Sequence, residues 1–108
     1  MTIFKLVLSF DGSGTNVFNR TESVGVKALT YNTSDTLTDP TTVKITIYKP
    51  DETVALAQTD MSKDSTGTYH YNYAIASDAD TGLWNASIET VTTDYTVKNI
   101  MFLVTEII

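Results

Sequence analysis

The 108-residue chain contains no cysteine and only one histidine. Without cysteine there is no disulfide to support the fold and no thiolate to perform chemistry. The missing cysteines do not identify the compartment, because a protein outside the cell can dispense with disulfides when its core is adequate. A serine nucleophile would need the single histidine, His70, and no nucleophile-elbow pattern is present. We therefore expect no catalytic, cofactor-binding or metal-ligating residues, and no enzyme.

Basic residues are also scarce. Seven Lys and Arg against thirteen Asp and Glu give a formal net charge of −6. The seven basic residues are scattered singly, whereas phosphate binding requires clusters of Lys and Arg. The same acidity disfavours an anionic membrane surface. We expect no nucleic-acid partner, and we interpret the charge as a contribution to solubility.

Long apolar runs are absent as well. No run approaches the length of a membrane span. Residues 2–10 are apolar but short, and they contain Lys5 without a clean small-residue cleavage site after them. We interpret this segment as a strand rather than a signal peptide.

Hydrophobic residues nevertheless make up 42% of the chain. That fraction is enough for one core and lies well above the range of disordered chains. Val, Ile, Thr and Tyr are common, and these residues favour strands. A chain of this length is one domain's worth, so we expect residues 1–108 to form a single domain.

The clearest strand pattern lies in residues 64–75 (DSTGTYHYNYAI). Tyr69, Tyr71 and Tyr73 alternate there with small or polar side chains. Successive side chains of a strand point to opposite faces, so one face is aromatic and the other is polar. We expect the polar face, which includes His70, to be exposed.

Two more segments show the same alternation, residues 43–48 and 83–90. The core side chains predicted from the three patterns are Tyr69, Tyr71, Tyr73, Trp84, Val43, Ile45 and Ile47. Weaker patterns predict strands at 3–10, 22–31, 54–61 and 95–108. The side-chain parity is expected to break near the end of 22–31. In the last strand, a change of parity predicts a bulge at Lys98-Asn99.

These segments amount to about seven strands with turn signals roughly every eight to twelve residues. No helical periodicity persists anywhere in the sequence. The pattern predicts an antiparallel β-sandwich with two facing hydrophobic layers and no disulfide. The strands at 68–75 and 83–90 are expected to be neighbours across the turn at 77–82.

Three motifs connect this pattern to known proteins. Residues 45–54 (ITIYKPDETV), 64–75 and 81–89 (TGLWNASIE) resemble an immunoglobulin-like (Ig-like) sandwich. The chain is similar, over residues 17–104, to macroglobulin-type and to bacterial or phage Ig-like modules. In those modules a strand ending in Pro-Asp-Gly leads to Gly-x-Tyr and later to Gly-x-Trp. Glu52 stands here where that glycine is usual.

The segment around Gly67 also resembles the penultimate strand of an immunoglobulin domain. The resemblance implies that Tyr69 is the tyrosine of a tyrosine corner, with its hydroxyl bonded to nearby backbone. Tyr71 then stands where a cysteine is expected, which fits a chain with no disulfide.

Several loop motifs have more than one interpretation. Asp78 and Asp80 precede a glycine, but calcium prefers several hard oxygens and two carboxylates are too few. Whether they bind calcium is left open, as it is for Asp35 and Asp39. Asn19, Asn32 and Asn85 each begin an N-glycosylation triplet, which matters only in a secreted protein.

Candidate interface residues come from outward aromatics and from the chain end. Tyr31, Tyr48 and Tyr95 are expected on outer faces, where grouped aromatics can form a binding patch. The chain ends on Ile107-Ile108. Such an apolar end is either an edge strand covered by a partner or simply the last core strand.

The sequence thus predicts a non-enzymatic structural or interaction module that docks with the protein subunits of a larger assembly and that can form a homo-oligomer. The resemblance to phage-type modules implies a virion component, such as a neck, head–tail connector or capsid-decorating protein. The alternatives are a cell-surface or adhesion-type module that binds carbohydrate or a protein receptor, and an accessory domain of an enzyme. The expected location is therefore a virion, the extracellular space or the cell surface.

Overall fold

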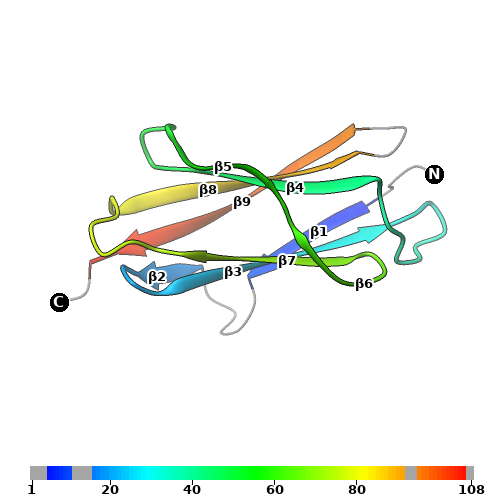
Figure 1. The fold of residues 1–108 in the computed structure, drawn as a ribbon, viewed down its shortest axis with the longest axis horizontal. Coiled ribbons are helices and arrows are strands. Elements are labelled where there is room, and N and C mark those ends of the chain that lie inside the picture. Colours follow the sequence, from blue (N-terminus) through cyan, green and yellow to red (C-terminus); the bar gives the residue numbers. More distant parts are fainter. Residues whose placement is uncertain (1–4, 11–15, 92–94, 107–108) are drawn as a thin grey trace.

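The computed structural model describes residues 5–10, 16–91 and 95–106. Within these ranges every regular element is a strand, and the strands form two sheets, of four and five strands (Figure 1). The two sheets lie face to face with the hydrophobic side chains between them. The all-β sandwich predicted from the alternating pattern is confirmed.

Each sheet joins strands that are distant in the sequence. The four-stranded sheet has the order β1 (Lys5–Phe10), β3 (Ser23–Tyr31), β7 (Thr68–Ala74) and β6 (Ser62–Ser65). The five-stranded sheet has the order β2 (Val17–Asn19), β9 (Tyr95–Thr105), β8 (Gly82–Val91), β4 (Thr42–Tyr48) and β5 (Val54–Asp60). Nine strands are described instead of about seven. The short strands β2 and β6 have three and four residues, too few to show an alternation.

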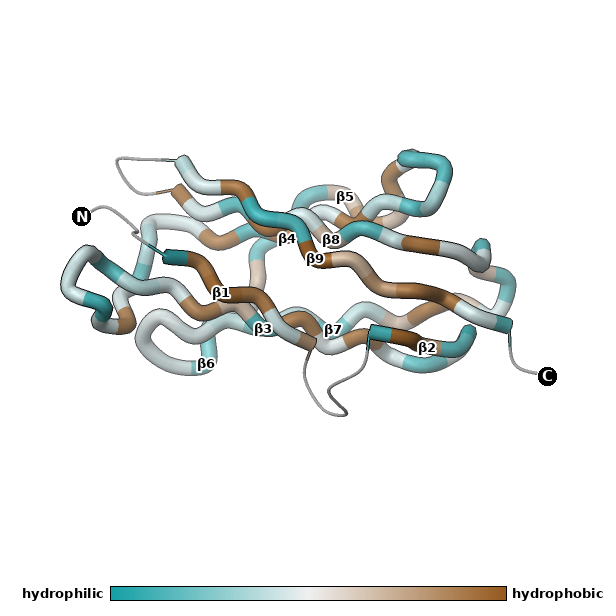
Figure 2. Tube along the Cα trace, turned by 180° about the vertical axis from the view of Figure 1, so that it is seen from behind, coloured by the Kyte–Doolittle hydropathy of each residue, from teal (hydrophilic) through white to brown (hydrophobic). Residues whose placement is uncertain are grey.

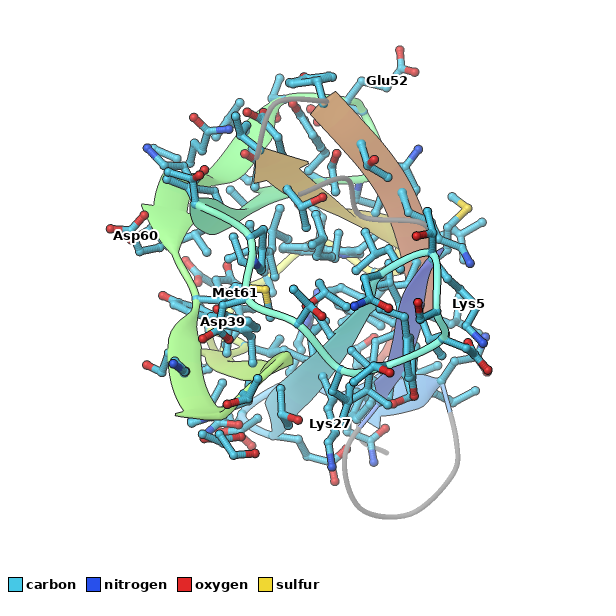
Figure 3. All side chains as sticks on the ribbon, turned by 90° about the vertical axis from the view of Figure 1, so that its right-hand side faces the viewer. Lys5, Lys27, Asp39, Glu52, Asp60 and Met61 are labelled. Atoms are coloured by element: carbon cyan, nitrogen blue, oxygen red, sulfur yellow. The ribbon has the colours of Figure 1, made fainter. Side chains whose placement is uncertain are left out.

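One open side of the sandwich is closed by a segment that belongs to both sheets. The chain leaves β5 of one sheet and enters β6 of the other through Met61 (Figure 3). Met61 is buried, and its backbone N–H donates to the carbonyl of Val43 at 2.9 Å. On the other side, β1 lies in the four-stranded sheet, whereas β2 pairs in parallel with the end of β9.

The strands β7 and β8 are not neighbours, contrary to the expectation from sequence. They lie in opposite sheets, so residues 75–81 carry the chain across the core rather than around a hairpin. The rings of Tyr73 and Trp84 meet across that core, with centroids 6.1 Å apart. Alternation shows which side of a strand is buried, but it does not show which strand lies beside it.

The bulge expected at Lys98-Asn99 is also absent. The pairing of β8 with β9 runs without a shift from Gly82↔Val104 to Val91↔Tyr95. Tyr95 and Val97 instead point outward and are 65% and 45% exposed. The prediction was wrong because it assumed that an apolar side chain must face the core.

The parity break expected near the end of residues 22–31 does not occur either. Buried and partly exposed positions alternate through the whole of β3, with Thr30 buried on the core face. The Thr30 hydroxyl donates to the carbonyl of Thr38 at 2.6 Å, so a polar residue is accommodated there. Leu29 and Tyr31 lie on the outer face.

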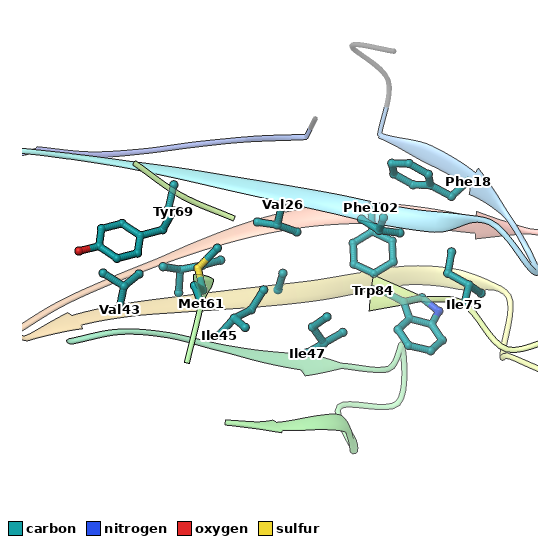
Figure 4. Close-up of a cluster of buried hydrophobic side chains, with 14 of the residues drawn as sticks. Phe18, Val26, Val43, Ile45, Ile47, Met61, Tyr69, Ile75, Trp84 and Phe102 are labelled. Carbon is teal, nitrogen blue, oxygen red and sulfur yellow. The ribbon is translucent and has the colours of Figure 1, made fainter. Parts of the chain in front are cut away.

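The core lies between the two sheets (Figure 4). Its aromatic cluster includes Phe10, Phe18 and Phe102, whose rings meet edge to face at 5.6–6.0 Å between centroids. Trp84 extends the cluster, with its ring 5.9 Å from that of Phe102. Of the core residues named from sequence, Val43, Ile45, Ile47, Tyr69 and Trp84 are buried, and Tyr71 and Tyr73 are half-buried against them.

One carboxylate connects the β3–β4 loop to the β6–β7 hairpin. Asp39 accepts hydrogen bonds from Lys63 Nζ (2.6 Å), the Gly67 backbone N–H (2.8 Å) and the Tyr69 hydroxyl (3.1 Å). The tyrosine-corner expectation is therefore corrected, because the Tyr69 hydroxyl bonds a side chain rather than backbone. Gly67 has a φ of 69°, and an added Cβ would lie 2.8 Å from the Thr30 carbonyl oxygen.

These contacts shift two pKa values in opposite directions. The hydrogen bond from Lys63, followed by that from Gly67, lowers the pKa of Asp39 below 3.8. Burial, followed by the contact with Asp39, raises the pKa of Tyr69 to about 12. At neutral pH Asp39 is therefore ionised and Tyr69 is a neutral donor.

The first prediction concerns the core. Ile45→Ala should lower the free energy of unfolding by about 2–5 kcal/mol, because a fully buried side chain leaves a cavity. Thr46→Val, on the outer face of the same strand, is the matched control and should cost less than about 1 kcal/mol. Urea unfolding measures both. Equal losses for the two variants would contradict the burial pattern of β4.

The second prediction concerns pH. Asp39→Ala should lower the unfolding free energy by about 2 kcal/mol at pH 7, because three donors lose their acceptor. The folded-state pKa of Asp39 is depressed, so the stabilisation is present above pH 3.8 and is lost as the pH falls through the folded pKa.

The difference in melting temperature between the wild type and Asp39→Ala should therefore shrink below about pH 4. Asp60→Ala, an exposed carboxylate on β5, is the control. A difference that is the same at pH 7 and pH 2.5 would show that the charge of Asp39 has no role.

Candidate interaction surface

Exposed apolar side chains concentrate on the strands of the five-stranded sheet. Of the eight large hydrophobic side chains that are exposed in the described residues, seven come from these strands, and only Leu37 lies elsewhere. Figure 2 shows hydrophobic residues along β9 and β2 at this side of the molecule. Soluble monomers rarely expose large contiguous apolar patches unless the patch is a contact surface.

The sheet register assembles four of these exposed residues, together with the partly exposed Tyr48, into two adjacent rows. Val17, Leu103 and Leu83 are opposite one another on β2, β9 and β8. In the next row, Met101 and Tyr48 lie on either side of Asn85. We call Val17, Tyr48, Leu83, Met101 and Leu103 the outer stripe.

A groove of about 490 Å³ opens beside the stripe. Its lining residues are Tyr48, Lys49, Pro50, Glu52, Leu83, Asn85 and Met101. The buried Oδ1 of Asn85 has no hydrogen-bond partner in the described part of the chain. Gly82 has a φ of 129° and no side chain, so Pro50 can pack against its backbone.

The rim of the groove contains the residue that replaces the usual glycine of the Pro-Asp-Gly motif. Glu52 has a φ of 70°, in the left-handed region that favours glycine. The turn is supported by Asp51, whose carboxylate accepts from the Thr53 hydroxyl at 2.6 Å. The glycine of the related modules is thus explained by the backbone conformation of this turn.

The three tyrosines named from sequence do not form one patch. Tyr48 and Tyr95 belong to the outer face of the five-stranded sheet, whereas Tyr31 belongs to the opposite sheet. The ammonium of Lys5 lies 4.5 Å from the centre of the Tyr31 ring. The Tyr95 hydroxyl donates to Glu89 at 3.3 Å, and partial desolvation, followed by the Glu89 charge, raises the pKa of Tyr95.

The chain end named as a candidate interface, Ile107-Ile108, lies outside the described residues. The described part of β9 ends at Thr105. There it is covered by β2, because the Thr105 hydroxyl donates to Asn19 Oδ1 at 2.6 Å and β2 pairs with residues 103–105.

The titratable candidates are dispersed. His70 is half-buried on the polar face of β7, and its Nδ1 lies 2.5 Å from Oδ1 of Asp64. Asp35 forms an ion pair with Lys5, whose Nζ lies 3.0 Å from Oδ1 of Asp35. Within the described residues, no three His, Asp or Glu side chains gather closely enough to hold a metal ion.

The Asp78–Asp80 loop holds a structural contact. The carbonyl oxygen of Asp80 accepts a hydrogen bond from the indole N–H of Trp84 at 2.9 Å. The adjacent carbonyl of Ala79 accepts from Arg20 Nε at 2.7 Å. The loop is thus tied to the core and to the segment before β3.

The three glycosylation triplets lie in different settings. Asn19 is on β2, and Asn32 accepts backbone N–H donors from Ser34 and Thr36 in the β3–β4 loop. Asn85 lies between residues of the outer stripe, where a glycan would cover the groove.

Sequence reasoning missed most of the outer stripe. Val17, Leu83, Met101 and Leu103 are exposed, whereas apolar side chains in strands were expected to face the core. The sequence signal for this surface is that apolar residues occupy both faces of residues 95–108, a pattern that predicted a bulge instead.

Comparisons with known proteins show a shared fold without a sequence family. No family model and no curated protein matches the chain. A Salmonella alpha-2-macroglobulin structure superposes with a TM-score of 0.77 and 22% identity over 97% of this chain, but over only 6% of its own. An elastase-activated Escherichia coli alpha-2-macroglobulin gives a TM-score of 0.69 and 22% identity over 93% of this chain and 8% of its own.

A single filamin domain has the same architecture. The filamin domain of Lin-41 gives a TM-score of 0.64 and 13% identity, with 91% of each chain covered. These similarities agree with the Ig-like fold that the sequence motifs resemble, and at such identities they show the fold alone. Among the described ranges there is no helix with the length and apolar character needed to cross a bilayer.

The third prediction tests whether the stripe is surface rather than core. Leu83→Ala should lower the unfolding free energy by less than about 1 kcal/mol, because Leu83 is 48% exposed. Ile88→Ala, on the inward face of the same strand, should cost about 2–5 kcal/mol. Urea unfolding of both variants decides the matter. A loss for Leu83→Ala as large as that for Ile88→Ala would mean that the stripe holds the fold together.

Proposed function

We propose that the chain is a non-enzymatic interaction module of a larger assembly. The outer stripe carries this proposal, because its apolar side chains face solvent beside a groove while the core of the sandwich is already complete. Burying apolar surface is the main favourable contribution to protein association. The natural partners of such a surface are other protein subunits.

The assembly we propose is a virion, with the chain as a neck, head–tail connector or capsid-decorating subunit. Support comes from the resemblance of Pro50-Asp51, Gly67-x-Tyr69 and Gly82-x-Trp84 to phage-type Ig-like modules. A small sandwich with one adhesive face suits a subunit that is repeated in a shell or ring. This part of the proposal rests on analogy of fold and motif.

A cell-surface or adhesion-type module is the second candidate. It is favoured by the similarity to domains of bacterial alpha-2-macroglobulins, in which the matched part is a small fraction of a long chain. Its ligand would be a carbohydrate or a protein receptor. Tyr48 lies in the groove and Tyr95 on the same outer face, and such rings can pack against a sugar.

The fourth prediction separates these two locations. Antibodies against the chain should detect it in density-purified virus particles from the source culture, at a fixed copy number and at one position in immunogold images. Detection in the cell envelope instead would favour the surface module. A protein found only in the soluble fraction, sedimenting as a free monomer, would contradict both.

A matched pair of variants connects this result to the stripe. Met101 and Val97 lie on the same face of β9 and are both 45% exposed, but only Met101 belongs to the stripe. Met101→Lys should be lost from the assembly, and Val97→Lys should be retained. Equal incorporation of the two variants would contradict a role for the outer stripe in assembly.

A further inference from the structure

The outer stripe has a chemical character that limits its partners. The chain carries a net charge of −6, yet none of the five stripe residues is charged. The groove beside them adds one cation, Lys49, and one anion, Glu52. Two copies of an acidic protein repel each other least when they meet through a surface without excess negative charge, and this surface satisfies that condition.

We propose that the outer stripe is a two-fold symmetric contact between two copies of this chain. The inference rests on the proposed function, because it names the partner of the same surface. In this contact the two five-stranded sheets pack face to face, about 10 Å apart as in a β-sandwich. A symmetric pair uses the same patch on both subunits.

The register of the sheet selects the direction of the axis. When the axis lies in the interface along β8, Leu83 faces its own copy and Met101 faces Tyr48 of the second chain. A second possible axis runs across the strands, through the row that contains Met101 and Asn85. It would place the Leu83 row of one copy over the polar row of Asn99 and Ser87 in the other copy. The axis along β8 therefore matches apolar with apolar, and it also sets Asn85 against its own copy.

The polar residue that lies between Met101 and Tyr48 also fits this axis. Asn85 lies on β8 between Met101 and Tyr48, and its buried Oδ1 lacks a donor in the described part of the chain. A carboxamide contains both a donor and an acceptor. Two Asn85 side chains on the axis can therefore bond each other once they turn toward the groove.

The available area fits a weak, concentration-dependent dimer. The strand residues of the five-stranded sheet, about 3.3 Å apart along a strand and about 4.8 Å apart between strands, present a face of roughly 600 Å². Standard interfaces bury about 800 Å² on each partner, and weaker, transient ones bury less. The twist of the sheets separates their ends, so the contact is centred on the stripe and Glu89 lies at its rim.

The fifth prediction is a concentration-dependent dimer. Light scattering across a concentration series of the wild type should show a shift from one chain to two. Met101→Lys should raise the dissociation constant at least about tenfold, because it places a charge in an apolar contact. Val97→Lys should change it by less than about threefold, and circular dichroism confirms that both variants fold. Added salt should strengthen the dimer by screening the acidic surfaces.

Crosslinking tests the axis itself. Because the chain has no cysteine, Leu83→Cys introduces a single thiol that a bifunctional reagent can link only to a second copy. Sheets about 10 Å apart hold the two Cα atoms too far apart for a disulfide, so the crosslinker is a short bismaleimide. It should convert Leu83→Cys into a covalent dimer and leave Val97→Cys largely monomeric. Equal crosslinking of the two variants would overturn the axis along β8.

The outcomes distinguish this inference from the proposed function. A strict monomer at every concentration, in a protein that still enters particles or envelopes, would contradict the dimer but not the proposed function. A dimer of a protein that joins no larger assembly would contradict the proposed function but not the dimer. Equal effects of Met101→Lys and Val97→Lys on the dimer would move the contact to another surface and overturn the proposal.

Discussion

Every strand of this protein has two faces, and the space between the sheets accepts only one of them. The inward residues of β4 and β8, such as Ile45, Ile47 and Ile88, have no exposed surface at all. A core packed in this way has no room for further side chains. Apolar residues at the alternate positions must therefore face solvent, and the outer stripe is a direct result of strand geometry.

This constraint also explains what the sequence could and could not reveal. Alternation in residues 43–48 and around Trp84 identified strands and their buried faces, because one side of each strand is uniformly apolar. It failed for β9, where both sides carry apolar residues. It also could not distinguish a hairpin from a crossover between Tyr73 and Trp84, because that choice depends on contacts distant in sequence. The Asp39 cluster was missed for the same reason, since its donors lie 24–30 residues away.

The candidate site is built mainly from apolar side chains. Asp39 and Tyr69, whose pKa values are shifted, bond each other and hold the β3–β4 loop to β7. The outer stripe provides area, shape and neutrality instead, which are the properties of a contact surface. The fold is shared with a domain of alpha-2-macroglobulin and with a filamin domain, and a shared fold does not specify a function.

The passage of the chain from one sheet to the other at Met61 affects how the protein unfolds. The segment that supplies an edge of one sheet continues directly as an edge of the other, so neither sheet can release this border alone. The two layers are thereby coupled into one cooperative unit. The point of coupling is a buried thioether, and its conversion to a polar sulfoxide would loosen both layers at once.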